Sequence, residues 1–148
     1  MANQAAEIAR GAVIAVDGIG VFGVELFLLR SGQVLINELA PRPHNSAHYS
    51  IEGCWSSQFD NHVRAVLGLP LGDPSLVMPA AAMVNLLGTQ AAPLDGLELA
   101  LAEPRAFVHL YGKSDNRPGR KMGHVTALGA SREEALLRAR SVAAGFLL

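Results

Sequence analysis

Apolar residues recur along this chain with two different spacings, which predicts both helices and strands. Near the amino terminus the spacing is helical, so an opening helix is expected. Two runs rich in valine, leucine and isoleucine follow, from Val21 to Leu29 and from Val34 to Leu39, with Ser31-Gly32 between them. This pattern predicts a β-hairpin. Because both strands carry apolar residues on both faces, we expect the hairpin to be buried. The helical set is Ala5, Ile8, Ala9, Ala12, Val13 and Val16.

The remainder of the chain predicts a second helix, further strands and a final helix. The second helix is expected to begin at Ser56 or Ser57 and to end near Leu67, before Gly68 and Pro70. Strands are expected at residues 82–87, 106–111 and 123–128, with a loop and a short helix near residues 95–101 after the first. Ser131 and Glu134 form a capping box that opens a helix through Ala143. The fold class predicted is α+β, with mainly antiparallel pairing. The buried face of the second helix is expected to be Phe59, Val63, Val66 and Leu67.

Composition narrows the class of protein. The chain has 148 residues, of which 50% are hydrophobic and 17% are charged, so a folded domain is expected rather than a disordered segment. The net charge of −1 indicates no general attraction to nucleic acid or to anionic membranes, and no apolar run is long enough to span a bilayer. The single cysteine, Cys54, excludes an internal disulfide and suits a cytoplasmic location.

The hairpin carries two carboxylates that the pattern brings together. If the turn centres on Ser31-Gly32, residues whose numbers sum to 63 face each other across the strands. Such opposed residues place their Cβ atoms roughly 4.5–5.5 Å apart, where like charges destabilise the pair. Opposed glutamates therefore need protons or a cation, and Mg²⁺ suits them because it can bridge carboxylates to nucleotide phosphates. The alternative is that one carboxylate is simply solvated at a strand end. The expected pairs are Arg30–Gln33, Phe27–Ile36 and Glu25–Glu38.

A loop of cationic and hydrogen-bonding residues follows the hairpin. Pro41 and Pro43 exclude a helix across residues 40–44. An arginine fork with neighbouring asparagine and histidine groups suits a small planar anion beside a magnesium nucleotide. Asn37, next to Glu38, adds a carbonyl oxygen for the metal or a hydrogen bond for a phosphate. Zinc binding by the two histidines and a polar loop without chemistry are the alternatives. The loop residues are Arg42, His44, Asn45, Ser46 and His48.

A second cationic cluster follows the strand predicted at residues 106–111. Pro118-Gly119 predicts a turn, so Lys113 and Arg120 are expected to flank one loop, with Asp115 the nearby anion. Two converging cations suit a phosphate monoester. From the residues alone, an ordinary solvated basic turn is the favoured reading.

Two stretches carry a resemblance to a known family. GVELFLL, GQVLINELAPRPHNSAHY and the residues up to GLPLG, together with YGKSDNRPGRKMGHVTALG, resemble the 5-(carboxyamino)imidazole ribonucleotide synthases, which are ATP-grasp ligases of purine biosynthesis. The resemblance implies that the chain is the carboxyl-terminal portion of such an enzyme. Residues 1–72 would be part of the ATP-grasp domain, and residues 73–148 a small β-rich domain with a final helix.

The resemblance also implies roles for the residues singled out above. Glu25 and Glu38 would bind the Mg²⁺ of ATP. Arg42, His44 and Asn45 would line the site where bicarbonate is activated. Lys113 and Arg120 would hold the phosphate of aminoimidazole ribonucleotide, which reverses the reading of a bland basic turn. The expected partners are these substrates, the amino-terminal half of the enzyme and a second copy in a homodimer, with neither nucleic acid nor membrane.

Two departures from the family pattern lead to further expectations. Ala47 replaces a usual glycine, and would be strained if that position has a positive φ. The chain is also about half the length of an ATP-grasp enzyme, so alone it is expected to be inactive. A formate-dependent glycinamide ribonucleotide transformylase is the nearest rival, but it would carry Asp-Thr-Gly in place of Asn45-Ser46-Ala47. A truncated product without catalysis, or a module that complements a separate half, is the other alternative.

Overall fold

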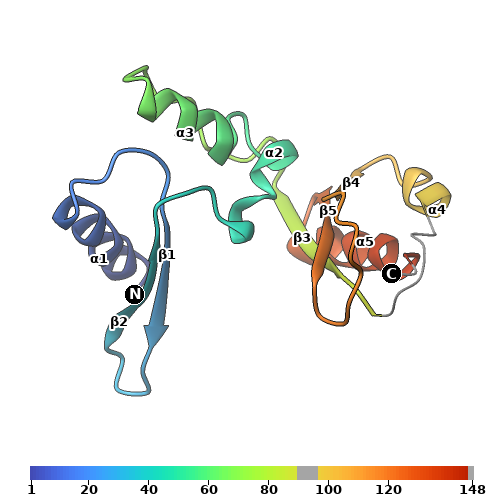
Figure 1. The fold of residues 1–148 in the computed structure, drawn as a ribbon, viewed down its shortest axis with the longest axis horizontal. Coiled ribbons are helices and arrows are strands. Elements are labelled where there is room, and N and C mark those ends of the chain that lie inside the picture. Colours follow the sequence, from blue (N-terminus) through green and yellow to red (C-terminus); the bar gives the residue numbers. More distant parts are fainter. Residues whose placement is uncertain (90–96, 147–148) are drawn as a thin grey trace. The chain divides into compact units, whose positions relative to one another are not determined.

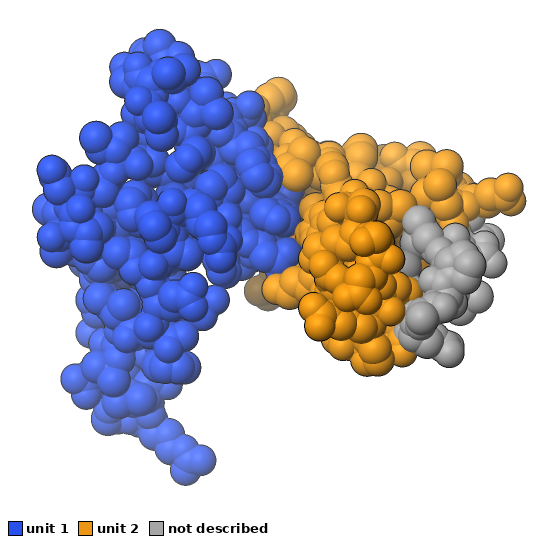
Figure 2. Space-filling model, viewed as in Figure 1, with its two compact units in different colours: residues 1–48, 56–73 blue, residues 49–55, 74–148 orange. Residues whose placement is uncertain are grey.

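The computed structural model describes residues 1–89 and 97–146, except for the side chains of residues 99 and 100. The chain divides into two compact units, coloured separately in Figure 2. The first contains residues 1–48 and 56–73, and the second contains residues 49–55 and 74–148. Residues 49–55 therefore lie in the second unit, although they precede the boundary expected near residue 72. The cause is local, because the backbone amide of Val77 donates to the carbonyl of Gly53 at 2.9 Å.

The first unit begins with helix α1 (Ala2–Ala15), as the helical spacing predicted. Strands β1 (Gly23–Leu28) and β2 (Val34–Ala40) follow and pair antiparallel, which confirms the hairpin. A short 3₁₀ turn, η1 (Asn45–Ala47), and helix α3 (Gln58–Val66) complete the unit. Figure 1 shows α1 lying alongside the two strands. Ser57 caps α3 and shares a capping box with Asp60.

The hairpin register differs from the expected one near the turn. Phe27 pairs with Leu35 rather than Ile36, and the amide of Leu29 donates to the carbonyl of Gln33, so Arg30 does not face Gln33. The loop has one residue more than expected, and Gly32 closes it with a positive φ of 84°. A β-bulge between Glu25 and Leu26 in the pairing leaves Asn37 as the extra residue of β2. The two shifts cancel, so Glu25 pairs with Glu38 as predicted.

The expected burial of the hairpin and of α3 is wrong for this chain. Phe27 and Ile36 are 54% and 49% exposed, and the α3 residues predicted to be buried are exposed as well. Within the described part of the first unit, Ala40 is the sole buried hydrophobic residue. The hairpin and α3 do carry the predicted apolar faces, but no described residue of this unit packs over those faces. The exposed α3 side chains are Phe59, Val63, Val66 and the following Leu67.

The second unit is built on a three-stranded antiparallel sheet in the order β3-β5-β4 (Figure 1). Its strands are β3 (Ala80–Leu87), β4 (Ala106–Leu110) and β5 (Lys121–Gly129), close to the predicted positions. Helix α5 (Arg132–Ala144) packs on the sheet, and Leu86, Val125 and Val142 belong to the core between them. Helix α2 (Ser50–Gly53) contacts β5, and α4 (Leu97–Leu101) precedes β4. The start of the predicted loop helix, at residues 95–96, lies outside the described residues.

The start of α5 follows the capping prediction in part. The Ser131 hydroxyl accepts from the amide of Glu134 at 3.1 Å, as a capping box requires. The Glu134 carboxylate instead accepts from the amide of Ala130 at 2.7 Å, one residue before the cap. The first of these hydrogen bonds satisfies an amide that the first turn of a helix leaves without a partner. Across residues 1–89 and 97–146, no helix is long and apolar enough to cross a membrane.

Candidate functional site

Glu25 lies at the centre of a polar group on the hairpin. It is the cross-strand partner of Glu38, and both glutamates are exposed. The Asn37 amide donates from Nδ2 to Glu25 Oε2 at 3.1 Å. In a regular strand, Asn37 and Glu38 would point to opposite faces, whereas the bulge lets both belong to the same cross-strand group. The structure therefore brings together all three residues predicted to serve a metal nucleotide.

His44 contacts the same carboxylate from the loop that follows β2. Its Nε2 lies 3.5 Å from Glu25 Oε1. This approach depends on Gly23, because a Cβ placed on that residue would lie 2.7 Å from both Cβ and Cγ of His44. His44 Nδ1 is 2.7 Å from the Ser46 hydroxyl, so Ser46 helps to orient the imidazole ring. Asn37 and His44 thus contact the two oxygens of one glutamate.

Gln58, the first residue of α3, holds the His44 loop in place. It is only 7% exposed. Its Oε1 accepts from the amide of His44 at 2.8 Å, and its Nε2 donates to the carbonyl of the same residue at 2.9 Å. Nε2 also lies 2.7 Å from Nδ1 of His48. Gln58 is not among the site residues predicted from the sequence, where its one signal is a polar side chain directly after the helix cap.

Arg42 and Asn45, two of the other predicted loop residues, form hydrogen bonds within the loop itself. Arg42 is exposed, and its Nη1 donates to the carbonyl of Pro43 at 3.2 Å. Asn45 begins the 3₁₀ turn, where its carbonyl accepts from the amide of His48 at 3.1 Å. Ala47 ends the same turn and is not among the described residues with positive φ. The replacement of glycine by alanine at that position therefore causes no backbone strain.

His62 has a structural role that the sequence analysis did not anticipate. Its Nδ1 accepts from the amide of Val21 at 3.1 Å. Gly20, with φ of 120°, passes so close that a Cβ there would lie 2.9 Å from the imidazole ring. The contact ties α3 to the segment before β1. Helical spacing could not reveal it, because the partner is 41 residues away.

The predicted cationic pair lies on the loop between β4 and β5. Pro118-Gly119 forms the expected turn, because the amide of Arg120 donates to the carbonyl of Arg117 at 3.0 Å. Arg120 Nη1 is 2.8 Å from Asp115 Oδ2, and Lys113 Nζ donates to the carbonyl of Lys121 at 2.6 Å. The Lys113 and Arg120 side chains are thus each held by a contact with a nearby residue. Each side chain carries further N–H donors that could bind an anion.

Gly88, just after β3, supports this loop. Its amide donates to the carbonyl of Arg120 at 2.8 Å, and its carbonyl accepts from the amide of Gly119 at 2.9 Å. A Cβ on Gly88 would lie 2.2 Å from Asn116 Oδ1 and 2.5 Å from the carbonyl oxygen of Arg117. Only glycine therefore allows the loop to approach the end of β3. Gly88 is not among the residues singled out from the sequence, because its partners lie on a loop about 30 residues further along the chain.

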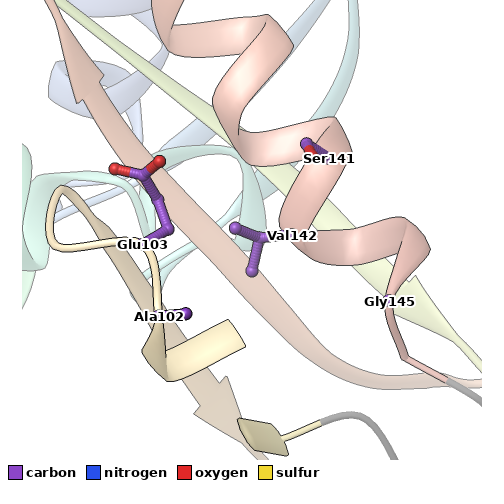
Figure 3. Close-up of a pocket in the computed structure, with 5 residues that line it drawn as sticks. All are labelled: Ala102, Glu103, Ser141, Val142 and Gly145. Atoms are coloured by element: carbon purple, nitrogen blue, oxygen red, sulfur yellow. The ribbon is translucent and has the colours of Figure 1, made fainter. Parts of the chain in front are cut away.

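A surface depression of about 380 Å³ lies elsewhere in the second unit, and Figure 3 shows its lining. Glu103 is its charged lining residue, and this carboxylate is already paired with Arg138 Nε at 2.9 Å. Converging polar groups with unused hydrogen-bonding capacity are what a specific ligand site needs. The depression therefore adds nothing to the candidate site. Its lining consists of Ala102, Glu103, Ser141, Val142 and Gly145.

Two protein-family models match separate parts of the chain. Residues 1–59 match the ATP-grasp domain, and residues 81–138 match the phosphoribosylaminoimidazole carboxylase C-terminal domain. The first match contains the Glu25 group and the His44 loop. The second contains Lys113 and Arg120.

Individual relatives agree with these matches. The chain is 49% identical over 134 residues to the chloroplastic phosphoribosylaminoimidazole carboxylase of Vigna aconitifolia, covering 86% of this chain and 24% of that protein. It superposes on the N5-carboxyaminoimidazole ribonucleotide synthetase of Thermotoga maritima with a TM-score of 0.87 and 47% identity, covering 97% of this chain and 41% of the other. It also resembles the Aspergillus clavatus N5-carboxyaminoimidazole synthase, solved with ADP and 5-aminoimidazole ribonucleotide, with a TM-score of 0.83, 44% identity and coverage of 97% and 39%. The chain therefore spans less than half the length of these proteins.

Proposed function

We propose that this chain forms part of an ATP-dependent ligase, because residues 1–59 match the ATP-grasp domain and residues 81–138 match the phosphoribosylaminoimidazole carboxylase C-terminal domain. The reaction proposed is carboxylation of aminoimidazole ribonucleotide with bicarbonate. Support comes from the solved relative that contains ADP and 5-aminoimidazole ribonucleotide, and from site residues in both matched regions. We assign the nucleotide to the first unit and the ribonucleotide phosphate to the second.

The observation that carries this proposal is the pairing of Glu25 with Glu38, with Asn37 donating to Glu25. Because the amide nitrogen of Asn37 is used on Glu25, its carbonyl oxygen is left as a donor to a metal. Among the described residues, no group of three or more His, Cys, Asp or Glu side chains is arranged to hold a metal. Two carboxylates nevertheless fit Mg²⁺, which usually keeps several waters and takes its other ligands from substrate phosphates. When bound, Mg²⁺ would neutralise charge on the nucleotide phosphates.

The loop residues have complementary tasks in this proposal. Arg42 binds the planar anion derived from bicarbonate, since its exposed guanidinium presents several donors in one plane. Asn45 supplies directional hydrogen bonds to the same anion. His44 stays beside Glu25 because Gln58 holds its backbone on both sides. Lys113 and Arg120 bind the phosphate monoester of the ribonucleotide.

Manganese binding by this chain tests the metal assignment. Mn²⁺ is a paramagnetic substitute for Mg²⁺, so it should broaden the amide NMR signals nearest Glu25, Asn37 and Glu38. The double variant Glu25→Gln/Glu38→Gln should lose this selective broadening, because it removes both charges and preserves the side-chain shape. Glu7→Gln, on the exposed part of α1, is the matched control and should leave the broadening unchanged. Broadening centred elsewhere, or retained in the double variant, would contradict the assignment.

A complementing module is the second candidate, and the exposed apolar hairpin favours it. In that case the chain acts only together with a separate amino-terminal portion. The test is ADP release in the presence of ATP, bicarbonate and aminoimidazole ribonucleotide, with this chain alone and with an amino-terminal portion of a relative. We expect release only from the mixture. Release by this chain alone would show that it is sufficient for catalysis.

A further inference from the structure

The β3-β5-β4 sheet, whose strand order Figure 1 shows, carries a row of polar residues across its three strands. Asn85, His124 and His109 are cross-strand neighbours on the three strands, in register. His124 is only 1% exposed, and it lies in β5, whose other buried residues are mostly apolar. Burying an imidazole is costly unless its nitrogens find partners. A row of polar side chains across this sheet therefore indicates a specific structural role.

The row continues into a chain of close contacts. Glu52 of α2 places Oε1 2.5 Å from Nε2 of His109. The rings of His109 and His124 are stacked, with centroids 4.6 Å apart and an angle of 12° between their planes. The Tyr111 hydroxyl lies 2.9 Å from Nδ1 of His124. Glu52 and Tyr111 are thus connected through two stacked imidazoles.

These contacts restrain the aromatic side chains. The Glu52 carboxylate contacts His109 at Nε2, and the His109 ring stacks on the buried ring of His124. His124 is thus held in place, and its Nδ1 is hydrogen-bonded with the Tyr111 hydroxyl. The Tyr111 ring is thereby held in one orientation.

Lys113 lies at the end of this chain. Its Nζ is 5.3 Å from the centroid of the Tyr111 ring, within cation–π range, and it donates to the carbonyl of Lys121. Tyr111 and Lys113 follow the end of β4 on either side of Gly112, which has a positive φ of 63°, and this turn of the backbone accompanies the approach of the ammonium to the ring. The orientation of the ring therefore sets where the ammonium can sit.

We propose that Glu52, His109, His124 and Tyr111 are positioning residues for Lys113, acting through the fixed Tyr111 ring. The functional part of this proposal rests on the proposed role of Lys113 in binding a phosphate monoester. The structural part is that the position of the Lys113 side chain depends on Tyr111 and His124, and it can be tested separately.

Binding of ribose 5-phosphate to this chain tests the purpose. We expect Tyr111→Leu, which removes the ring, to weaken binding by about two- to fivefold, in line with a cation–π contact at a partly exposed site. Tyr111→Phe keeps the ring but removes its hydrogen bond, and should weaken binding less. Tyr49→Phe removes the hydroxyl of the other tyrosine and should leave affinity unchanged. Equal affinity in wild type and Tyr111→Leu, with Lys113→Ala clearly weaker, would overturn the positioning proposal.

NMR of the chain without ligand tests the structural content. The Tyr111 ring should shift the Lys113 Hε signals upfield, and Tyr111→Phe should reduce that shift and change the ¹⁵N signal of His124 Nδ1. Glu52→Gln should alter the ¹⁵N signals of both histidines. If the Lys113 signals are the same in wild type, Tyr111→Phe and Glu52→Gln, the proposal is wrong. If the signals change as expected while Lys113→Ala binds ribose 5-phosphate as well as wild type, the phosphate role of Lys113 fails and the positioning of its side chain stands.

Discussion

Gly23 is the residue on which the geometry around Glu25 depends. The imidazole of His44 lies directly over it, where any side chain would collide, and this contact brings Nε2 of His44 to Glu25. The requirement is for space rather than for backbone freedom, since Gly23 is not among the described glycines with positive φ. A small residue in a strand thus marks a close approach between strand and loop.

Gly23→Ala should displace His44 from Glu25. Because Gln58 holds the His44 backbone on both sides, the loop cannot relax freely, and overpacking should lower the free energy of unfolding by about 1–3 kcal/mol. Urea unfolding measures the change. Gly11→Ala is the matched control, since a Cβ there meets nothing within 4 Å and α1 should gain about 0.4–1 kcal/mol from it. Equal effects of the two substitutions would show that His44 is not packed against Gly23.

At the scale of elements, the capping groups of α3 and α5 were readable in the sequence because they are local. In α3, Asp60 Oδ2 accepts from the Ser57 hydroxyl at 2.7 Å and from its amide at 2.9 Å. These two hydrogen bonds, the hydroxyl first, hold the pKa of the Asp60 carboxyl below its usual value. In α5, the amide of Ala130 and then the Arg138 side chain lower the pKa of the Glu134 carboxyl. Both shifts favour the ionised carboxylates in the folded chain.

The lowered pKa values of Asp60 and Glu134 predict that the folded chain loses stability in acid. A carboxyl whose folded pKa is depressed stabilises the fold fully above its unfolded pKa, about 4, and loses that contribution as the pH falls through the folded value. Asp60→Asn should therefore destabilise the chain at pH 7 and reduce the further loss on acidification below about pH 4. Urea unfolding at a series of pH values, followed by circular dichroism, measures this.

Two variants complete that experiment. Ser57→Ala removes the cap and should cost about 1 kcal/mol at neutral pH. Glu7→Gln changes an exposed carboxylate of α1 and should leave the pH profile as in wild type. A profile for Asp60→Asn that runs parallel to wild type would contradict the contribution of the α3 cap.

At the scale of the whole molecule, the two units differ in how much apolar surface they bury. Among the described residues, the first unit has one buried hydrophobic residue, Ala40, whereas the second has a core that includes Leu86, Met122, Val125, Val142 and Phe146. Apolar burial is the main favourable term in folding, so the second unit should be much the more stable.

Hydrogen exchange should report this difference directly. Amides of β5 and α5 are expected to exchange slowest, and those of β1 and β2 much faster, although both sets are hydrogen-bonded within their own elements. Mass spectrometry of exchanged peptides at fixed pH and temperature provides the measurement. Similar protection in the hairpin and in β5 would mean that the exposed hairpin is covered in solution, for example by association.

The sequence by itself determined most of the helices and strands, because helical spacing, alternating apolar runs and caps act between residues close in the chain. It also predicted the pairing of Glu25 with Glu38, which the structure reaches through a longer turn and a compensating β-bulge. Motifs in the sequence also carried a resemblance that the matches at residues 1–59 and 81–138 support. Only the tertiary structure decided the contacts of Gln58 with His44, of His62 with Val21 and of His109 with Glu52, whose partners lie 14, 41 and 57 residues apart. It also decided burial, because periodicity shows which face of an element is apolar but not what covers it. The exposed hairpin and α3 are the clearest cases.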